Sequence, residues 1–420
     1  MAMPEGERRP RDGALSKALI LTTDDPWKRG GMGGKHTHIR MLSEGFSQSG
    51  VRTDIVTVKE TPEFRFLHLY PGALRRRVLE TRDERYEHYA GQYEHQLARN
   101  LRLNALDQDV ANPHDPASAR CLDEALRRKG VRLPIVLTLH GYLTWEAASD
   151  GELTEGSPQY ARSLELEKQV HHSAWRIVCV DTRIRDHVLS LSGIDGSRVT
   201  VLPNAVDTET FTPPSDSQKR DARTRLGISP TAPVILCPRR LVAKNGVDRA
   251  VLAMRSVAKA HPEAVLLVAG DGPQRREIEA IVAREGLVRS VRMLGSVPHA
   301  RILDHYISSD IVVIPSVISS GVMEATSLSM LEGMATARPV VVTDIGGLKE
   351  TVQDGRTGLI VKQGDPEAIA SAVLDLLRDP ARAKALGTAA REHVEKHHSK
   401  LAHARRMLEE YRMAIAQGPP

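Results

Sequence analysis

The stretch "ALILTTDDPWKRGGMGGKHTHIRMLSEGFSQSGVRTDIVTV" (residues 18–58) determines the class of fold. It opens with a short apolar run that ends in polar residues, which is typical of a buried parallel strand. A glycine-rich turn follows, then a helical pattern that ends at Gly50, and then a second apolar run over residues 51–58. This order predicts a βαβ unit, whose strands are parallel and joined by a right-handed crossover.

The same alternation of strands and helices continues along the chain. Strands are predicted over 134–141, 176–181 and 198–211, and a stretch rich in proline, serine and aspartate at 212–221 indicates a linker. The pattern restarts near residue 233, which predicts a second doubly wound domain. Ligands of open parallel sheets bind beyond the carboxyl ends of the strands, so binding motifs are expected in the loops that follow strands.

The predicted fold class is therefore α/β, with two doubly wound Rossmann-like domains that face each other across a cleft. A final helical segment is expected to return toward the first domain. The predicted boundaries are a disordered tail at 1–14, an N-terminal domain at 15–211, a linker at 212–230, a C-terminal domain at 231–395 and the returning helix at 396–420.

Composition excludes several classes of function. The net charge of +5 is modest and aromatic residues make up only 4% of the chain, whereas nucleic-acid binders concentrate basic residues and aromatics in one patch. No apolar run approaches the roughly 18 residues that span a bilayer. The three cysteines form no CxxC pair, so neither a disulfide framework nor a zinc site is indicated, and a reducing cytoplasm fits.

The segment 73–103 is helical in pattern and densely charged. A solvated helix pair is the first interpretation. A basic face for a membrane surface is the alternative, but acidic residues are interspersed among the arginines, and anionic lipid favours clustered cations. Membrane association is therefore not expected.

The glycine cluster "GGMGGKHT" is not a standard nucleotide loop. The residue after Lys35 is His36, where a P-loop needs serine or threonine, and His36 also occupies the place of the third glycine in the dinucleotide fingerprint. Glycines before a helix still let backbone N–H groups approach an anion, with the helix dipole behind them. Gly31, Gly33 and Gly34 are therefore candidates for a phosphate cradle, and a tight strand-to-helix turn is the alternative.

The segment "CPRRLVAKNG" (237–246) directly follows a predicted strand. It places Arg239, Arg240 and Lys244 at the carboxyl end of that strand. Clustered cations there suit a diphosphate, because arginine offers a bidentate fork and lysine a point charge. Ordinary surface cations are the alternative.

The segment "TSLSMLEGMA" (326–335) predicts a helix after the strand "DIVVIPS". Thr326 or Ser327 is its natural N-cap. Glu332 shares the core-facing side with Leu328, and burying an unpaired carboxylate costs several kcal/mol. We therefore expect it to need donors, which the vicinal hydroxyls of a ribose would supply.

Glu324 precedes this helix, in a loop at the ligand edge, and could bind the hydroxyls of a sugar. Between the two glutamates, the N–H groups at the start of the helix would face a pyrophosphate. The alternative is a capping carboxylate together with a core carboxylate that is bonded to the backbone.

Taken together, these motifs resemble the retaining glycosyltransferases of family 4, which have the GT-B architecture. The resemblance covers about residues 15–400 and rests on "GGMGG", "TLHG", "LPNAVD", "RRLVAKNG", "AGDGP", "LGSV", the E-x7-E spacing and "PVVVTDIGG". It implies transfer of a hexose from a UDP- or GDP-linked sugar, held by the C-terminal domain, to an acceptor held by the N-terminal one. The low aromatic content and the mixed charges favour a small hydrophilic acceptor over a lipid. The resemblance implies no metal and no other cofactor.

The resemblance also assigns roles to matching positions. His140 would sit near the transferred sugar, as a positioning group or, alternatively, as nucleophile or base. The implied catalytic residues are His140, Glu324, Arg240 and Lys244; the donor-binding residues are Gly33, Gly34, Arg239, Arg240, Lys244, Val297, Glu324, Ala325, Thr326, Ser327 and Glu332; the acceptor-binding residues are Lys35, His36, His38 and Tyr142.

One motif departs from the family pattern R-L-x-x-x-K-G, because Asn245 occupies the place of the lysine and Lys244 comes one residue early. Either Lys244 reaches the phosphate from a shifted loop, or Arg239 and Arg240 share the task; Lys244 is the preferred assignment. Two alternatives stay open, namely a non-catalytic sugar-nucleotide binder with a degenerate site and a membrane-surface transferase with a lipid-linked acceptor. A cytoplasmic monomer or homodimer is expected.

Overall fold

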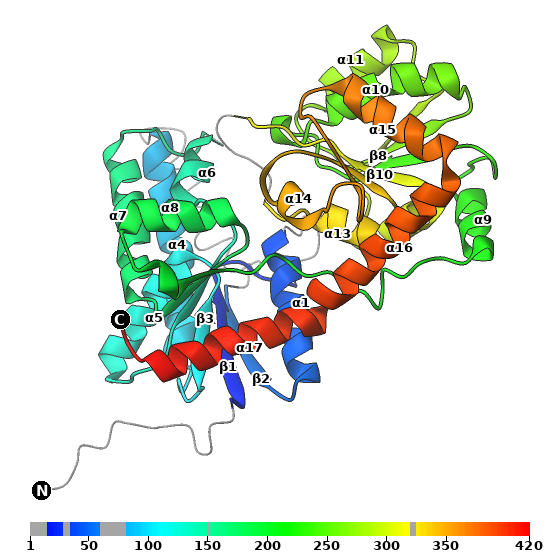
Figure 1. Ribbon diagram of the computed structural model, residues 1–420. Coiled ribbons are helices and arrows are strands. Elements are labelled where there is room, and N and C mark those ends of the chain that lie inside the picture. Colours follow the sequence, from blue (N-terminus) through cyan, green and yellow to red (C-terminus); the bar gives the residue numbers. More distant parts are fainter. Residues whose placement is uncertain (1–14, 28–33, 59–80, 150, 320–324) are drawn as a thin grey trace, which may run out of the picture. The chain divides into compact units, whose positions relative to one another are not determined.

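The computed structural model describes residues 15–27, 34–58, 81–149, 151–319 and 325–420. The chain divides into two compact units (Figure 1). Unit 1 comprises Met1–Pro203 and His403–Pro420, and unit 2 comprises Asn204–Ala402. Among the described residues, no helix is long and apolar enough to cross a membrane.

Unit 1 is built on parallel strands in two groups, with the orders β2-β1-β3 and β4-β5-β6. A parallel bridge between Ala111 and Ile135 links the groups. The strands are β1 (Lys17–Thr22), β2 (Arg52–Thr57), β3 (Val110–Pro113), β4 (Val136–Leu139), β5 (Arg176–Cys179) and β6 (Val199–Val201). The predicted βαβ unit is present, since β1 and β2 pair in parallel around α1 (Gly34–Gln48) and Gly50 has a φ of 77°.

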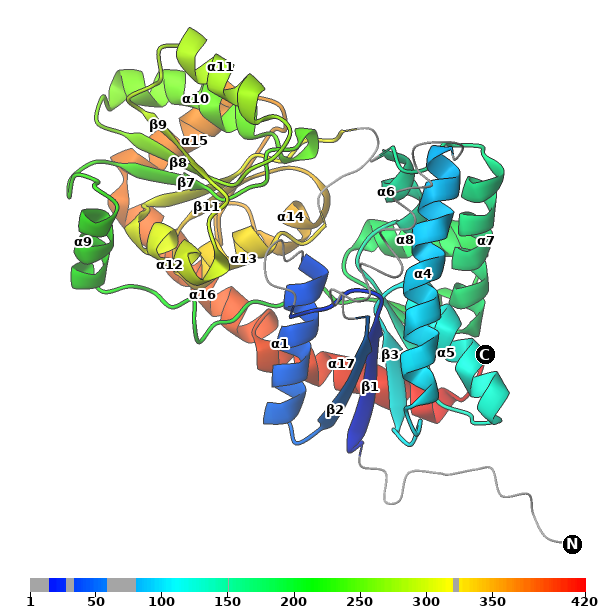
Figure 2. The ribbon, with the colours of Figure 1, turned by 180° about the vertical axis from the view of Figure 1, so that it is seen from behind.

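Helices cover both faces of the unit 1 sheet. On one face, α1 and α17 (Lys400–Gln417) pack against the strands in a core that includes Phe46, Met407 and Tyr411. The opposite face carries α4 and α5, as Figure 2 shows. The remaining elements are α4 (Arg82–Arg102), α5 (Pro116–Lys129), α6 (Leu143–Ser149), α7 (Pro158–Ser173), α8 (Thr182–Ser192) and the 3₁₀ turn η3 (Gly196–Arg198).

Unit 2 contains one parallel sheet with the order β12-β11-β10-β7-β8-β9. The order reverses between β10 and β7, which is where open parallel sheets form their ligand crevice. The strands are β7 (Val234–Cys237), β8 (Val265–Ala269), β9 (Val291–Gly295), β10 (Ile311–Ile314), β11 (Val340–Thr343) and β12 (Leu359–Val361).

Two separate cores lie on the two faces of the unit 2 sheet. One is formed with α10, α11 and α15, and the other with α12, α13, α14 and α16 (Figure 1). The helices are α9 (Asp216–Arg225), η4 (Ala243–Asn245), α10 (Val247–Ala260), α11 (Arg275–Arg284), α12 (His299–Ser308), α13 (Leu328–Ala335), α14 (Gly346–Thr351), α15 (Pro366–Arg378) and α16 (Pro380–His397). The predicted α/β class is confirmed.

The prediction of a linker at 212–230 is wrong. This segment contains α9, which begins with a capping box formed by Ser215 and Gln218. Arg223 of α9 is 5% exposed and pairs with Asp310, which precedes β10, at 2.8 Å. The Pro/Ser/Asp-rich sequence thus marks the start of a helix that belongs to unit 2. The short strand β3 was not predicted.

Helix α17 is tied to the sheet of unit 1 by a buried ion pair. Arg176 of β5 and Glu410 of α17 have side chains that are 4% and 7% exposed, and Arg176 Nε lies 2.7 Å from Glu410 Oε2. Removing one partner of such a pair leaves a buried charge unpaired, which lowers the stability of the fold by about 3–5 kcal/mol.

We expect Glu410→Ala to destabilise unit 1 by about 3–5 kcal/mol, measured by urea unfolding. All three tryptophans, Trp27, Trp145 and Trp175, lie in unit 1, so their fluorescence reports on this unit alone. The exposed Glu409 provides the control, because Glu409→Ala should change stability by no more than about 0.5 kcal/mol. Equal midpoints for the two variants would contradict the assignment.

Candidate functional site

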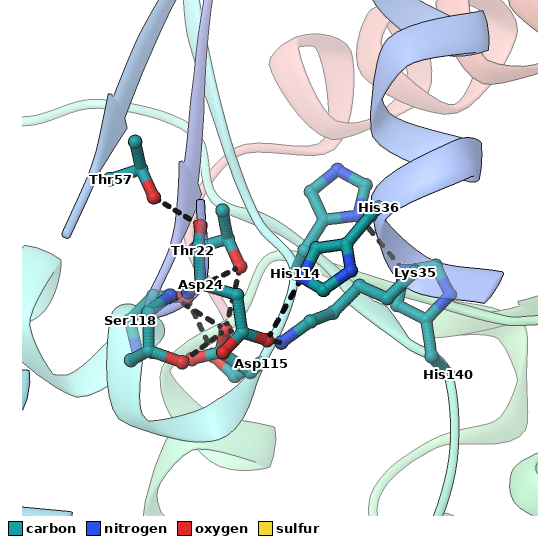
Figure 3. Close-up of polar contacts among 10 residues, drawn as sticks. Thr22, Asp24, Lys35, His36, Thr57, His114, Asp115, Ser118 and His140 are labelled. Carbon is teal, nitrogen blue, oxygen red and sulfur yellow. Dashed lines mark hydrogen bonds and ion pairs between the residues drawn. The ribbon is translucent and has the colours of Figure 1, made fainter. Parts of the chain in front are cut away.

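Polar side chains gather where three neighbouring strands of unit 1 end (Figure 3). Asp24 follows β1, His114 and Asp115 follow β3, and His140 follows β4. Lys35, in the first turn of α1, reaches the same group. The sequence-predicted Lys35 and His140 are thus brought together, as expected for loops at one edge of a parallel sheet.

Lys35 is the cation of this group, and two carboxylates hold it. Its Nζ lies 2.5 Å from Asp24 Oδ2 and 3.3 Å from Asp115 Oδ2. Burial acts to lower the pKa of Lys35, but the charges of Asp115 and Asp24 raise it above its ordinary value. Burial acts to raise the pKa of Asp115, yet Lys35 and the N–H of Thr23 hold it below the usual range. Lys35 therefore stays charged, and Asp115 stays ionised beside it.

Four imidazoles pack beside Lys35. The ring centroid of His38 lies 4.7 Å from those of His140 and His403. His114 Nδ1 lies 3.0 Å from His140 Nε2, so one of these nitrogens donates to the other. Burial, followed by the neighbouring charge of His38, lowers the pKa of both His114 and His140 well below the ordinary value. At neutral pH both rings are uncharged.

Three of these rings have the geometry of a metal ligand set. His38, His114 and His140 each offer a ligand nitrogen, and these nitrogens lie within 4.8 Å of one another. His114 Nε2 is buried and has no hydrogen-bond partner in the part of the chain that the structure describes. Lys35, whose charge acts on His114 and His140, is itself paired with Asp24 and Asp115. The neutral rings offer both hydrogen-bond donors and acceptors to a ligand.

The other predicted residues of unit 1 are spread around this cluster. His36 Nε2 lies 3.7 Å from Asp24 Oδ2, and Gly34 is the exposed first residue of α1. Tyr142 is 7% exposed and its ring packs against Trp145, with burial raising its pKa to about 12. Gly31 and Gly33 lie outside the described residues.

In unit 2, the start of α13 lies at the carboxyl edge of the sheet beside a buried cation. Ser327 is the N-cap, and its hydroxyl accepts from the N–H of Met330 at 3.4 Å. Arg239 is 8% exposed, and its Nη1 donates to Ser327 Oγ at 3.0 Å. Of the two predicted N-caps, Ser327 is confirmed. A guanidinium next to a helix N-terminus is an arrangement that suits phosphate oxygens.

Glu332 is buried, 6% exposed, but already has donors within the protein. The Tyr306 hydroxyl donates to Oε2 at 2.8 Å, and His299 Nε2 lies 3.2 Å from Oε1. Burial and the Glu332 charge raise the pKa of Tyr306 well above its usual range, so this phenol stays protonated. The expectation that Glu332 needs a ligand to supply its donors is therefore wrong. The His299 side chain is 43% exposed, so this is the contact that a ligand hydroxyl can replace.

The remaining residues predicted to bind the donor differ in their exposure. Arg240 is exposed, Lys244 is half-buried within η4, and Val297 packs against the core beside α12 and α13. Ala325 is half-buried and Thr326 is buried immediately before α13. Glu324 lies outside the described residues.

Sequence reasoning missed His114, Asp115 and His403. Asp115 caps α5 by accepting from the N–H of Ser118 at 2.7 Å, and proline follows it at the first helical position. Such an Asp-Pro pair after the short apolar run "DVANP" is a recognisable helix start that would have located the first two residues. His403 is on α17 and meets His38 only through the fold, so no local signal could have found it.

Two family models match the chain. "Glycosyltransferase Family 4" matches residues 32–210, and "Glycosyl transferases group 1" matches residues 218–393. A D-inositol 3-phosphate glycosyltransferase from Xylanimonas cellulosilytica is 30% identical over 409 residues, covering 92% of this chain and 93% of the relative. The chain therefore belongs to glycosyltransferase family 4, and the predicted family is confirmed.

Other known proteins match only part of this chain or share its fold. A GDP-mannose-dependent monoacylated alpha-(1-6)-phosphatidylinositol monomannoside mannosyltransferase from Corynebacterium glutamicum is 34% identical over 196 residues, covering 46% of this chain. The match spans about half of that relative, 51% of its length. The sucrose-phosphate synthase of Thermosynechococcus elongatus shares the fold, with a TM-score of 0.73 and 22% identity over 96% of this chain and 100% of that one.

We expect unit 1 to lose stability as the pH falls below about 6.5, where histidines of the unfolded chain become protonated. His114 and His140 have lowered pKa values in the folded state, so the unfolded state binds more protons. Their contribution is therefore fully present above about pH 6.5 and declines by up to ~1.4 kcal/mol per pH unit for each ring below it. Urea unfolding followed by tryptophan fluorescence from pH 7.5 to 5.5 measures this slope.

His114→Asn should flatten this pH dependence, because one titrating ring is removed. The exposed His95 on α4 provides the control, since His95→Asn should leave the slope unchanged. An identical slope in the wild type and in His114→Asn would show that the cluster is not buried as neutral rings.

Proposed function

We propose that this protein transfers a hexose from a nucleotide diphosphate sugar, UDP- or GDP-linked, to a small hydrophilic acceptor. The observation that carries the proposal is the contact between the buried guanidinium of Arg239 and the N-cap of α13. It places a cation next to a helix N-terminus, which suits a diphosphate. Glu332 follows in the same helix, where its carboxylate suits the hydroxyls of a ribose.

The chemistry follows from charge development on the leaving group. As the bond from the sugar to the diphosphate breaks, negative charge grows on the phosphate oxygens. Preorganised cations and helix N–H groups stabilise this charge without reorganisation, which is the role that a divalent ion has elsewhere. Sugar transfer in this proposal therefore proceeds without a metal. Retention of configuration at the transferred carbon is part of the proposal because the motifs resemble those of retaining enzymes.

The acceptor in this proposal is bound by unit 1. The neutral rings of His114 and His140 suit sugar or cyclitol hydroxyls. A relative that matches over most of this chain is named for D-inositol 3-phosphate, which is a small hydrophilic molecule. A lipid-linked acceptor is the second candidate, because the Corynebacterium relative is named for a phosphatidylinositol mannoside. A cytoplasmic location and a monomer or homodimer complete the proposal.

We expect one of UDP, GDP, ADP and dTDP to stabilise unit 2 by about 2.7 kcal/mol at a hundred times its Kd. A thermal-shift panel measures this effect. Glu332→Gln should lose most of the stabilisation, because an amide replaces the carboxylate that binds the ribose hydroxyls. The exposed Glu392 on α16 supplies the control Glu392→Gln, which should respond like the wild type. If no nucleotide stabilises the wild type, the proposed function fails.

Acceptor transfer should be independent of metal. After dialysis against EDTA, turnover of the stabilising donor with inositol 3-phosphate should stay within about twofold of the untreated enzyme, because the charge stabilisation comes from the protein. Product analysis by NMR reads the anomeric configuration in the same experiment. Loss of turnover that added Mg²⁺, Mn²⁺ or Zn²⁺ restores would contradict this expectation, and restoration by Zn²⁺ alone would point to the histidine cluster.

A further inference from the structure

Three imidazole rings from separate elements of unit 1 converge at one point. His38 lies on α1, His114 follows β3 and His140 follows β4. Each ring offers one ligand nitrogen, and these nitrogens lie within 4.8 Å of one another. Among the described residues, no other group of three or more histidine, cysteine or carboxylate side chains has this spacing.

The backbone of unit 1 holds these rings in place. The N–H of His114 donates to the carbonyl oxygen of Leu21 at 2.8 Å, which ties the residue to the end of β1. The parallel bridge between Ala111 and Ile135 joins β3 to β4, the strands that precede two of the rings. His38 and His114 are each 1% exposed. The ligand nitrogens are therefore presented by a packed frame, as a preformed metal site requires.

The spacing of the rings is close to that of zinc ligands. A Zn–N bond is about 2.0–2.1 Å long, so two nitrogens of a tetrahedral site lie about 3.3 Å apart. His114 Nδ1 lies 3.0 Å from His140 Nε2, so two of the rings already approach each other this closely. The upper limit of 4.8 Å for the whole set exceeds the tetrahedral spacing by about 1.5 Å, which small rotations of the side chains can close.

His114 also has a nitrogen that the protein leaves without a partner. Its Nε2 is buried, and no described residue forms a hydrogen bond with it. Buried polar atoms in folded proteins nearly always have a partner, and an exception points to a ligand or an ion. His140 is only half-buried, so an ion can enter the cluster past this ring.

The charge of Lys35 does not exclude a cation at the rings. Figure 3 shows Lys35 beside His114 and His140. Its Nζ lies 2.5 Å from Asp24 Oδ2 and 3.3 Å from Asp115 Oδ2. Two carboxylates therefore pair with one ammonium, and they offset the repulsion that the ammonium alone would exert on a metal ion.

We propose that His38, His114 and His140 bind one zinc ion, and that the bound ion competes with the acceptor. Zn²⁺ takes imidazole nitrogens readily, whereas Mg²⁺ and Ca²⁺ prefer oxygen ligands. Competition follows because His114 and His140 are the rings assigned above to the acceptor hydroxyls. This second part rests on the proposed function, and it makes the ion an inhibitor rather than a cofactor.

The site is tested on the full chain after treatment with EDTA and removal of the chelator. Isothermal calorimetry with Zn²⁺ should show one tight site. Co²⁺ in the same site should absorb visible light strongly, as a four- or five-coordinate ion does, and not weakly like the hydrated ion. His114→Asn and His140→Asn should each weaken Zn²⁺ binding by roughly a hundredfold or more, because loss of even an outer partner of a metal ligand costs ten- to a hundredfold.

Helix α16 supplies the matched control. His393 and His397 lie one turn apart there, with ring centroids separated by 4.9 Å, and form a pair without a third ligand. The exposed His397 can be replaced, and His397→Asn should leave the tight site within about twofold of the wild type. Circular dichroism melts establish that each variant is folded, and the Co²⁺ spectrum of the wild type tests the site without any substitution.

Competition is tested by sugar transfer in the wild type, with the free Zn²⁺ concentration set by a metal buffer. Near its Kd, Zn²⁺ should about double the apparent KM for inositol 3-phosphate, since half of the sites are then closed to the acceptor. The value of kcat and the KM for the donor should stay within about twofold.

The outcomes separate the zinc site from the proposed function. A wild type that binds no Zn²⁺, a Co²⁺ spectrum like that of the hydrated ion, or folded ring variants that bind within about twofold of the wild type overturn the inference. Zinc that binds through the rings and leaves the acceptor KM unchanged overturns the competition. Zinc binding that depends on the rings, in a protein that transfers sugar from no donor, supports the zinc site and overturns the function.

Discussion

Helices cover both faces of both parallel sheets, and this coverage decides where polar groups can lie. The strands β7, β8, β10 and β11 are buried along their whole length. A polar side chain inside such a strand must find a partner there, as Asn112 does when it accepts from the Tyr411 hydroxyl at 2.8 Å. Elsewhere polar groups collect where strands end. Both candidate sites therefore lie at the carboxyl ends of strands, which the βα loops follow.

The two candidate sites differ in the charges of the side chains that form them. In unit 1, the cation Lys35 is paired with Asp24 and Asp115, and the rings of His114 and His140 beside it are neutral. Such a site suits hydroxyl groups, which need both donors and acceptors. In unit 2, Arg239 donates to Ser327 Oγ at the N-terminus of α13, an arrangement that suits an anion. The division matches what an acceptor and a diphosphate each require.

The sequence predicts the fold well because each strand and helix carries a local signal. The alternation of apolar runs and helical patterns was sufficient for two doubly wound units, and Ser327 was identifiable as a cap from its position before α13. Three kinds of feature were beyond local reasoning. The strand β3 has only four residues, and α9 lies in a segment whose composition resembles a linker. His403 packs against His38 although 365 positions (403 minus 38) of sequence separate them.

Glu332 illustrates how burial was predicted correctly while its consequence was not. Helical periodicity indicated a buried carboxylate, and the side chain is 6% exposed. The inferred need for ligand donors was wrong because Tyr306 and His299 come from α12, whose packing against α13 is a tertiary contact. The spacing of the motif at residues 239–245 is a second case, because the displaced lysine left a degenerate diphosphate site open as an alternative. A sequence motif specifies the spacing of residues along the chain, whereas the binding of a phosphate depends on where charges lie in three dimensions. Because Arg239 donates to Asn245 Oδ1, a cation lies close to position 245 even though the motif departs from the family pattern there.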